Sequence, residues 1–588
     1  MSKRQDVADR FKNKKGKREK VVKCSLQNRL IEKSLLPEIE KWVLTVSKIT
    51  NKGSLVFNRL LLHCLNNGIE LPNLSDLTLY LQCLNIGSGV ILKRNPPLEE
   101  VWNNYFTEYP SIPKIKGDIQ AYTYAAKTYQ TNFINSLKFT FEKRQKYFIR
   151  KWCEVNKIDS SNIYPIICEV NKRNYISKGE LSEKVKDFIE IQKETLGNEE
   201  EITTEWIGSH KENVVSYFWV ILNYIQQFED VRKFTLAPIS NIKRHFISID
   251  TKVLFRMLQN IKLFEGNLKT FQSLRNEHFN TIFNLKGLST GEFSYMIETD
   301  SVSACFHFHV PEKKVSPCSN QTKQRSRVIA IDPGRVNLVY GVEKTNTGIK
   351  TYSLTRREYY NSSGMNASNN ITSKWEKDIE EAEKIFRQQS IKTVDENIWD
   401  QFLADYISVY DILWEGKTGK KWARNNFRTY CLKRKTLDNF FQKMKGNTKP
   451  VIAYGAAKFN STSRGELSAP TTYVSKRCAK HYPTVMVDEF RTTKMCYKCR
   501  KPLQPTFRYI EDQLREVRGL RWCRSTNCCT FLNRDLNAAL NILRCFKSGN
   551  KNIRPKYLSR KPFVTDEDSF KCKTTEKRVR GKIIGKTR

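Results

Sequence analysis

The chain lacks long apolar runs. No stretch reaches the roughly 18 consecutive apolar residues that a membrane-spanning helix requires. The most apolar segment, residues 214–225, is long enough only for a buried helix. Residues 1–23 also lack the apolar core of a secretory signal. We therefore expect a soluble, intracellular protein that uses no membrane.

Acidic residues are scarce relative to basic ones. The 588 residues include 102 Lys and Arg against 61 Asp and Glu, which gives a formal net charge of +41. An excess of this size indicates a polyanionic partner, and because no membrane segment is present we expect that partner to be nucleic acid. A chain of this length also has room for several domains and needs no disulfide bonds to fold.

Most of the 16 cysteines are isolated, and in a reducing compartment we expect no disulfide framework. Two pairs are different: Cys496 and Cys499 form a C-x2-C pair, and Cys523 and Cys528 form a C-x4-C pair after 23 intervening residues. Two such pairs supply the four thiolates of one tetrahedral, structural Zn²⁺ ion. Cys529 follows directly and is the alternative to Cys528 as the fourth ligand.

A zinc ion held by four thiolates has no open coordination position, so any catalysis needs other residues. Glu489 lies seven residues before the first cysteine of the pairs, Asp535 lies seven residues after Cys528, and Asp332 ends the apolar segment VIAID. Three such carboxylates can hold two Mg²⁺ ions roughly 3.5–4 Å apart and so cleave a phosphodiester. Asp488 is an alternative to Glu489, because neighbouring residues of a strand point to opposite faces.

Charge composition and the pattern of apolar residues divide the chain into segments. Residues 1–23 hold ten Lys and Arg against three acids, and we expect a flexible basic arm; residues 547–588 form a basic tail that we also expect to be poorly ordered. Residues 24–240 show mostly helical periodicity. Residues 241–320 contain short alternating runs typical of strands. Strands and helices alternate over residues 321–546, which indicates an α/β domain.

Four segments carry a family resemblance: AIDPGRVNLVYGV, LTRREYYNSSG, DEFRTTKMCYKC and NRDLNAALNIL, in this order between about 327 and 546. Together they resemble the Fanzor proteins, eukaryotic relatives of the transposon-encoded TnpB nucleases. The resemblance implies a multidomain α/β fold in which an RNase H-like RuvC nuclease domain (321–546) contains an inserted zinc ribbon (490–531). A helical recognition lobe (24–240, with the first wedge strand) and a β-rich wedge module (241–320) would precede it.

The same resemblance implies an activity. The expected protein is an RNA-guided DNA endonuclease encoded by a eukaryotic transposable element and acting in the nucleus by two-metal-ion hydrolysis. Its guide RNA would come from the element's own end, and its target would be double-stranded DNA beside a short flanking motif. The alternatives are a catalytically inactive RNA-guided DNA-binding protein and a guide-free transposon-end nuclease or transposase.

The resemblance also implies the catalytic residues. Asp332 matches the first RuvC acid and Asp535 the last. The middle acid departs from the TnpB pattern, in which a glutamate ends the strand that corresponds to VIAYGAA; Tyr454 and Gly455 stand there instead. Fanzor proteins often show this rearrangement, with a glutamate in the segment that matches Glu489. We therefore expect Asp332, Glu489 and Asp535, called the acid triad below, to bind the two Mg²⁺ ions.

Overall fold

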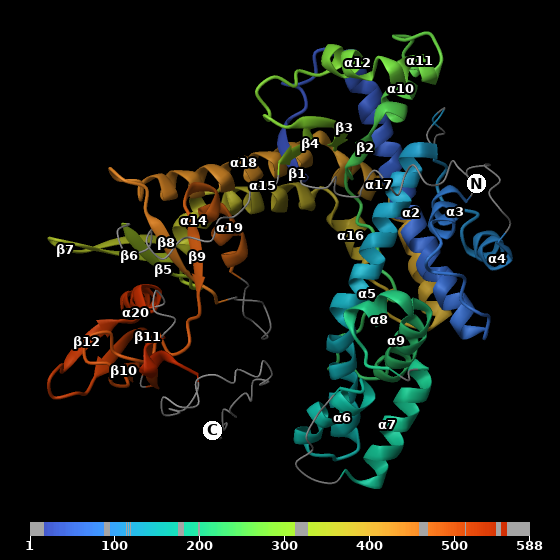
Figure 1. Ribbon diagram of the computed structural model, residues 1–588. Coiled ribbons are helices and arrows are strands. Elements are labelled where there is room, and N and C mark those ends of the chain that lie inside the picture. The colour runs from blue at the N-terminus through green and yellow to red at the C-terminus, as the bar shows by residue number, and fades with distance from the viewer. Residues whose placement is uncertain are drawn as a thin grey trace. The chain divides into compact units, whose positions relative to one another are not determined.

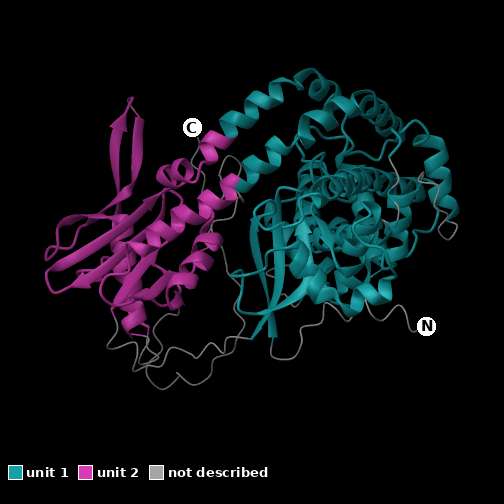
Figure 2. Cartoon of the chain, turned by 90° about the horizontal axis from the view of Figure 1, so that it is seen from above, with its two compact units in different colours: residues 1–313, 369–427 teal, residues 314–368, 428–588 magenta. Residues whose placement is uncertain are grey.

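In the computed structural model, whose helices and strands Figure 1 labels, the chain forms two compact units, which Figure 2 colours separately. Unit 1 comprises residues 1–313 and 369–427, and unit 2 comprises residues 314–368 and 428–588. Predictions for residues 1–16 and 561–588 lie outside the described residues. The structure describes residues 17–560 except for 87–94, 113–114, 116, 118, 174–180, 198–199, 312–326, 458–468, 512 and 549–553.

Residues 35–225 of unit 1 are mostly helical. Helix α2 is buried along most of its length, and several of its polar side chains bond within the helix: the Ser47 hydroxyl donates to the Val43 carbonyl at 2.6 Å, for example. Among the described residues, no helix is long and apolar enough to cross a membrane. The helices are α2 (Leu35–Asn66), α3 (Leu77–Asn85), α4 (Pro96–Tyr105), α5 (Ile119–Val155), α6 (Ile163–Val170), α7 (Glu183–Leu196), α8 (Thr204–Ser209) and α9 (Lys211–Ile225).

Unit 1 also contains a four-stranded sheet with the order β1-β4-β3-β2. Strand β1 begins at Lys17, so residues 17–23 are not a flexible arm as predicted. They are ordered because β1 pairs antiparallel with β4 along all nine of its residues, and Val22 and Cys24 pack on the core. The elements are β1 (Lys17–Ser25), β2 (Ile247–Ile249), α10 (Thr251–Asn260), α11 (Leu268–Ser273), α12 (Arg275–Ile282), β3 (Glu292–Thr299) and β4 (Ser303–Pro311).

A segment from the second half of the sequence completes unit 1. Residues 369–427 were predicted to belong to one domain spanning 321–546, but the structure places them in unit 1. The reason is that α17 buries aromatic side chains such as Trp399 and Tyr406 in the unit 1 core. The helices are α15 (Met365–Lys377), α16 (Glu380–Phe386), α17 (Glu396–Thr418) and α18 (Lys420–Gln442), of which α15 and α18 continue into unit 2.

Unit 2 is built on a five-stranded mixed sheet with the order β7-β6-β5-β8-β9. Strand β5 pairs antiparallel with β6 and parallel with β8, so it lies in the centre. All five of its residues are buried, because helices cover both faces of the sheet. The strands are β5 (Val328–Asp332), β6 (Asn337–Thr345), β7 (Gly348–Thr355), β8 (Val451–Gly455) and β9 (Thr484–Val487).

The two faces of this sheet have different partners. Ile329 and Ile331 point toward α14 (Arg356–Ser362), α18 and α19 (Thr471–His481). Val328 and Ala330 point toward α20 (Arg534–Ser548). Because side chains alternate along a strand, Asp332 shares the α20 face with Val328 and Ala330.

A second, three-stranded antiparallel sheet lies in the chain between β9 and α20. It has the order β10-β11-β12 and covers most of the predicted zinc ribbon, with β12 ending two residues beyond it. The strands are β10 (Gln504–Ile510), β11 (Gln513–Cys523) and β12 (Thr530–Asn533).

The start of the basic tail is ordered, contrary to expectation. Helix α20 continues to Ser548, and residues 554–560 include the short 3-10 helix η3 (Lys556–Leu558). Leu558 is fully buried in the α20 core, and the Arg554 guanidinium donates to the Phe490 carbonyl at 3.2 Å. Apolar burial and this bond hold the segment on unit 2.

Candidate active site

The acid triad comes from three elements of unit 2. Asp332 is the last residue of β5, Glu489 follows the end of β9 by two residues, and Asp535 is the second residue of α20. Asp332 is only 6 % exposed. Since β5 is central and Asp332 points toward α20, the fold brings the first and last acids of the sequence pattern to the same end of the sheet.

The three carboxylates interact electrostatically. Burial raises the pKa of Asp332 well above its usual range, and the charges of Glu489 and Asp535 raise it further. Burial likewise raises the pKa of Glu489 to about 7. Each group would be more readily ionised beside a cation. The guanidinium of Arg534 is the nearby cation that lowers the pKa of both Asp332 and Glu489.

Glu489 lies at the carboxyl end of β8. The backbone N–H of Ala457 donates to its Oε1 at 2.9 Å. A Cβ atom built on Gly455 would lie 2.0 Å from the same oxygen, so the Glu489 carboxylate occupies the space beside this glycine. Its position therefore corresponds to the strand end at which the TnpB pattern expects a glutamate.

Asp488, the alternative to Glu489, faces other groups. Its carboxylate accepts hydrogen bonds from the Arg560 guanidinium at 2.7 and 3.0 Å and lies 3.6 Å from Arg554. Arg560 and Arg554 lower the pKa of Asp488, which is the opposite direction from Glu489. Asp488 is thus neutralised by the ordered start of the tail.

Asp535 is held by side-chain and capping contacts. The Asn337 amide donates to its Oδ2 at 2.7 Å. The Asn533 side chain accepts the backbone N–H groups of Asp535 and Leu536, each at 3.0 Å, and so caps the start of α20. An acid in the first turn of a helix is also stabilised by the helix dipole.

Two asparagines that the sequence did not single out join α20 to the ribbon. Asn537 and Asn541 are both fully buried, and each donates to the carbonyls of Thr492 and Met495 at 2.8–2.9 Å. Asn537 also accepts the backbone N–H of Tyr497 at 2.9 Å. Their spacing of four residues on the apolar face of a helix was the available signal.

The four predicted zinc ligands lie together. The sulfurs of Cys496, Cys499, Cys523 and Cys528 are all within 4.8 Å of one another, with Cys496 and Cys528 at 3.8 Å and Cys499 and Cys523 at 3.3 Å. A tetrahedral site with Zn–S bonds of about 2.3 Å places sulfurs about 3.8 Å apart, so this cluster fits a structural zinc ion. Cys529 is exposed and is not one of the four clustered cysteines.

The acid triad is more widely spaced than this thiolate cluster. Among the described residues, the four cysteines form the one group of three or more potential ligands whose atoms all lie within 4.8 Å. Carboxylates that share two ions roughly 3.5–4 Å apart can be spread more widely than ligands of one ion. Their hard oxygen atoms, burial and mutual repulsion suit divalent Mg²⁺.

Comparison with known proteins identifies one part of the chain. Residues 470–542 match the family model described as Cas12f1-like, TNB domain. This segment runs from the start of α19 through the ribbon into α20 and includes Glu489, the thiolate cluster and Asp535. The match supports a relation to TnpB- and Cas12-like nucleases. No curated protein sequence matches the chain.

Two solved structures also match. The cryo-EM structure of CasPhi-2 (Cas12j) bound to crRNA covers 51% of this chain at 13% identity with a TM-score of 0.26, and the chain spans 60% of that protein's length. The match to the structure of the mini-RNA-guided endonuclease CRISPR-Cas phi3 covers 92% of this chain and 94% of that protein's chain, at 12% identity with a TM-score of 0.29.

Proposed function

We propose that the chain is an RNA-guided, Mg²⁺-dependent DNA endonuclease of the RuvC type. The observation that carries the proposal is the convergence of the acid triad, in which two further acids raise the pKa of buried Asp332. The Cas12f1-like segment and the net charge of +41 support it. The mixed sheet covered by helices on both faces is compatible with an RNase H-like nuclease domain.

The acid triad would hold the two Mg²⁺ ions, which when bound supply the charge that activates water and stabilises the leaving oxygen. The protein's own groups orient the ligands beforehand. The Ala457 N–H directs one Glu489 oxygen, and the Asn337 amide directs one Asp535 oxygen. Arg534 partly neutralises the acids. Preorganised ligands of this kind need little rearrangement during the reaction.

The zinc ribbon has a structural role in this proposal. The four-thiolate site has no open position for substrate. Instead, the ribbon joins the chain segments that carry Glu489 and Asp535, and Asn537 and Asn541 fasten its start to α20. Loss of the ribbon would therefore misplace two acids of the triad.

The narrower identity is also a proposal. We infer that the chain is a Fanzor-like protein of a eukaryotic transposable element that acts in the nucleus with a guide RNA from the element's own end. Guide pairing would select the double-stranded target, and the protein would recognise a short flanking motif. The motifs around Asp332, Glu489 and Asp535, with the acid moved from the β8 position to Glu489, support this inference.

Expression with the native flanking DNA, followed by sequencing of the RNA that stays bound, tests this function. We expect one abundant RNA from the element's end and, with that RNA, cleavage of matched DNA that requires Mg²⁺. Retention of matched DNA without cleavage would show an inactive guided binder instead. Cleavage or tight binding of element ends without any RNA would show a guide-free nuclease or transposase.

A further inference from the structure

Unit 1 contains a cavity of about 670 Å³ that lies outside the candidate active site. Its walls come from α2, residues 239–243, the last turn of α15, the end of α16 with residues 387–391, α17 and the first turns of α18, all within unit 1. Its volume falls in the range of roughly 300–1,000 Å³ typical of small-molecule sites. The cavity can therefore accept a ligand of nucleotide size.

Cations outnumber acids around this cavity. Lys243, Arg387 and Lys417 line it, against Glu376. Arg387 and Lys417 both pair with the single carboxylate of Glu383, at 2.6 Å for Lys417, so one of these two positive charges is uncompensated. Lys243 is exposed and forms no ion pair within the described part of the chain. An anionic group is the complement of such a wall.

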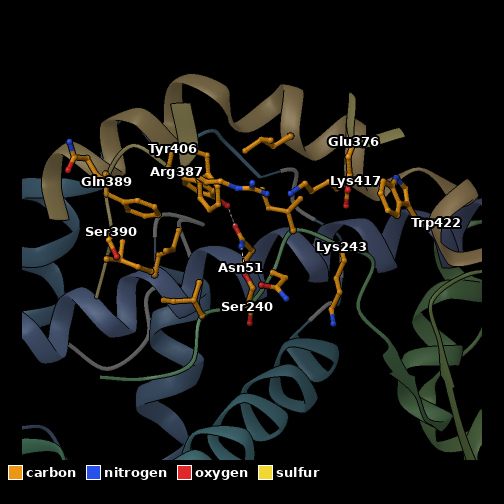
Figure 3. A pocket seen from close by; sticks show the side chains of 18 of the residues that line it. Asn51, Ser240, Lys243, Glu376, Arg387, Gln389, Ser390, Tyr406, Lys417 and Trp422 are labelled. Atoms are coloured by element: carbon orange, nitrogen blue, oxygen red, sulfur yellow. Dashed lines mark hydrogen bonds between the residues drawn. The ribbon is translucent and has the colours of Figure 1, made fainter. Parts of the chain in front are cut away.

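An aromatic ring lies beside these cations. Figure 3 shows Trp422 and Lys417 toward one end of the cavity and Gln389 and Ser390 toward the other, with Arg387 between them. Trp422 is half-buried, and its indole N–H donates to the Gly416 carbonyl at 2.7 Å, which fixes the ring. A fixed, partly open aromatic ring offers a stacking surface for a base.

A second cavity of about 210 Å³ shares Lys243, Lys417 and Trp422 with the first. Lys23, Arg244 and Asp300 line its other side, and Arg244 is already paired with Glu40 at 2.8 Å. The hollow therefore continues past the ring, with both basic and acidic groups along it. This leaves room for a ligand whose phosphate is one link in a longer chain.

We propose that this cavity binds a nucleoside phosphate, with its base stacked on Trp422 and its phosphate on the side lined by Lys243 and Lys417. The ligand is either a free nucleotide or one unpaired nucleotide of a bound RNA. The RNA form rests on the proposed function, whereas the free-nucleotide form does not. Bases stack on aromatic side chains strongly enough for the loss of Trp422 to weaken binding measurably.

Binding of AMP and UMP to the full chain, measured by isothermal titration calorimetry, tests the free-nucleotide form. We expect saturable binding that weakens by about tenfold or more in Lys243→Ala and Trp422→Leu, a change that calorimetry resolves. Trp422→Phe should keep most of it because a ring remains. Lys269→Ala on α11, an exposed lysine outside both cavities, is the matched control and should bind like the wild type.

Ultraviolet crosslinking of the RNA that copurifies with the protein tests the RNA form. We expect a crosslink in the peptide that contains Trp422, lost in Lys243→Ala and retained in Lys269→Ala. Unfolding temperatures of all variants show whether a loss of binding or crosslinking comes from the altered cavity or from misfolding. If Trp422→Leu misfolds, Lys243→Ala still tests the proposal, because Lys243 is exposed. If the wild-type protein shows no nucleotide binding and no crosslink, the proposal is overturned.

Guided DNA cleavage is scored separately, so that the two proposals can fail independently. Wild-type protein that cuts guided DNA but shows no nucleotide binding and no crosslink overturns the cavity assignment alone. Protein that binds nucleotide in this cavity but never cuts guided DNA overturns only the proposed endonuclease activity.

Discussion

Glu489 occupies the space that a side chain at Gly455 would fill. A Cβ atom at Gly455 would lie 2.0 Å from the Glu489 Oε1 and 2.7 Å from its carboxyl carbon. The two residues are 34 positions apart in the sequence but share one place at the end of β8. One acid thus lies where the TnpB pattern would have it, although it comes from a different segment.

Gly455→Ala should therefore displace the Glu489 carboxylate. Because contacts below 3.0 Å force a shift, we expect guided DNA cleavage to slow by about tenfold or more, a barrier increase of about 1.4 kcal/mol. Single-turnover cleavage rates measure this. Gly519→Ala is the control, because nothing lies within 4 Å of a Cβ there. Equal cleavage rates for the two variants would show that a side chain at Gly455 does not displace the Glu489 carboxylate.

The reciprocal exchange is a stricter test of the same relationship. Glu489→Ala should abolish cleavage, and adding Gly455→Glu should restore a measurable part, because the new side chain enters the vacated space. The Ala457 N–H remains available to orient it. If the double variant stays as inactive as Glu489→Ala, an acid placed at the end of β8 is not sufficient for cleavage.

Zinc content should depend on Cys496 and not on Cys529. Cys496→Ser removes one of four sulfurs that lie within 4.8 Å of one another, so we expect it to lose the single bound zinc and the ribbon to unfold. Cys529→Ser changes an exposed thiol outside the cluster and should retain one zinc per chain. Elemental analysis of both purified variants measures this; zinc loss in Cys529→Ser would show that the ligand set is misassigned.

Asn537→Ala should loosen the ribbon from α20. The change leaves the Tyr497 N–H without its acceptor and removes a donor from the carbonyls of Thr492 and Met495. Each buried group left unsatisfied costs about 1–3 kcal/mol. Chemical unfolding should show this loss, while exposed Asn527→Ala should not. Equal stabilities would mean that the buried amide does not hold the ribbon.

The pH dependence of stability should include a contribution from Glu343. Its hydrogen bonds from the Arg327 guanidinium, one of them at 2.7 Å, lower the pKa of Glu343 below its usual value. A carboxyl whose pKa is lowered in the folded state stabilises the fold at pH values above its unfolded-state pKa of about 4.3. This stabilisation is lost as the pH falls through the folded-state pKa. Glu343→Gln should therefore be less stable than wild type at neutral pH.

That difference should shrink below about pH 4, because protonated Glu343 and glutamine then resemble each other. Urea unfolding at several pH values measures it. Glu380→Gln changes an exposed surface pair with Lys384 and should leave stability nearly unchanged throughout. A difference for Glu343→Gln that stays constant with pH would contradict the assignment.

Local patterns were enough to predict several features. The two cysteine pairs predicted a four-sulfur cluster, because each pair forms one tight turn whose sulfurs face one point. The apolar segment ending at Asp332, which drew attention to this acid, is a strand buried on both faces, since every residue before the acid is apolar. The helical periodicity of residues such as 35–66 agreed with α2.

Other features depend on contacts between distant segments. The order of residues 17–23 comes from pairing with β4, almost 300 residues away, and the lysines there suggested only a flexible arm. Residues 369–427 belong to unit 1 because side chains of α17 are buried in the core of that unit. The position of Glu489 beside Gly455 depends on parallel pairing of β8 with β9.

Cleavage of guided DNA by Asp332→Ala, compared with Asp488→Ala, tests whether the acid triad is the nuclease site. Both variants remove one carboxylate from unit 2, but Asp488 is neutralised by Arg560 and Arg554. We expect Asp332→Ala to keep its bound RNA and to lose Mg²⁺-dependent cleavage, whereas Asp488→Ala still cuts. Undiminished cleavage by Asp332→Ala would show that Asp332 is not a catalytic residue.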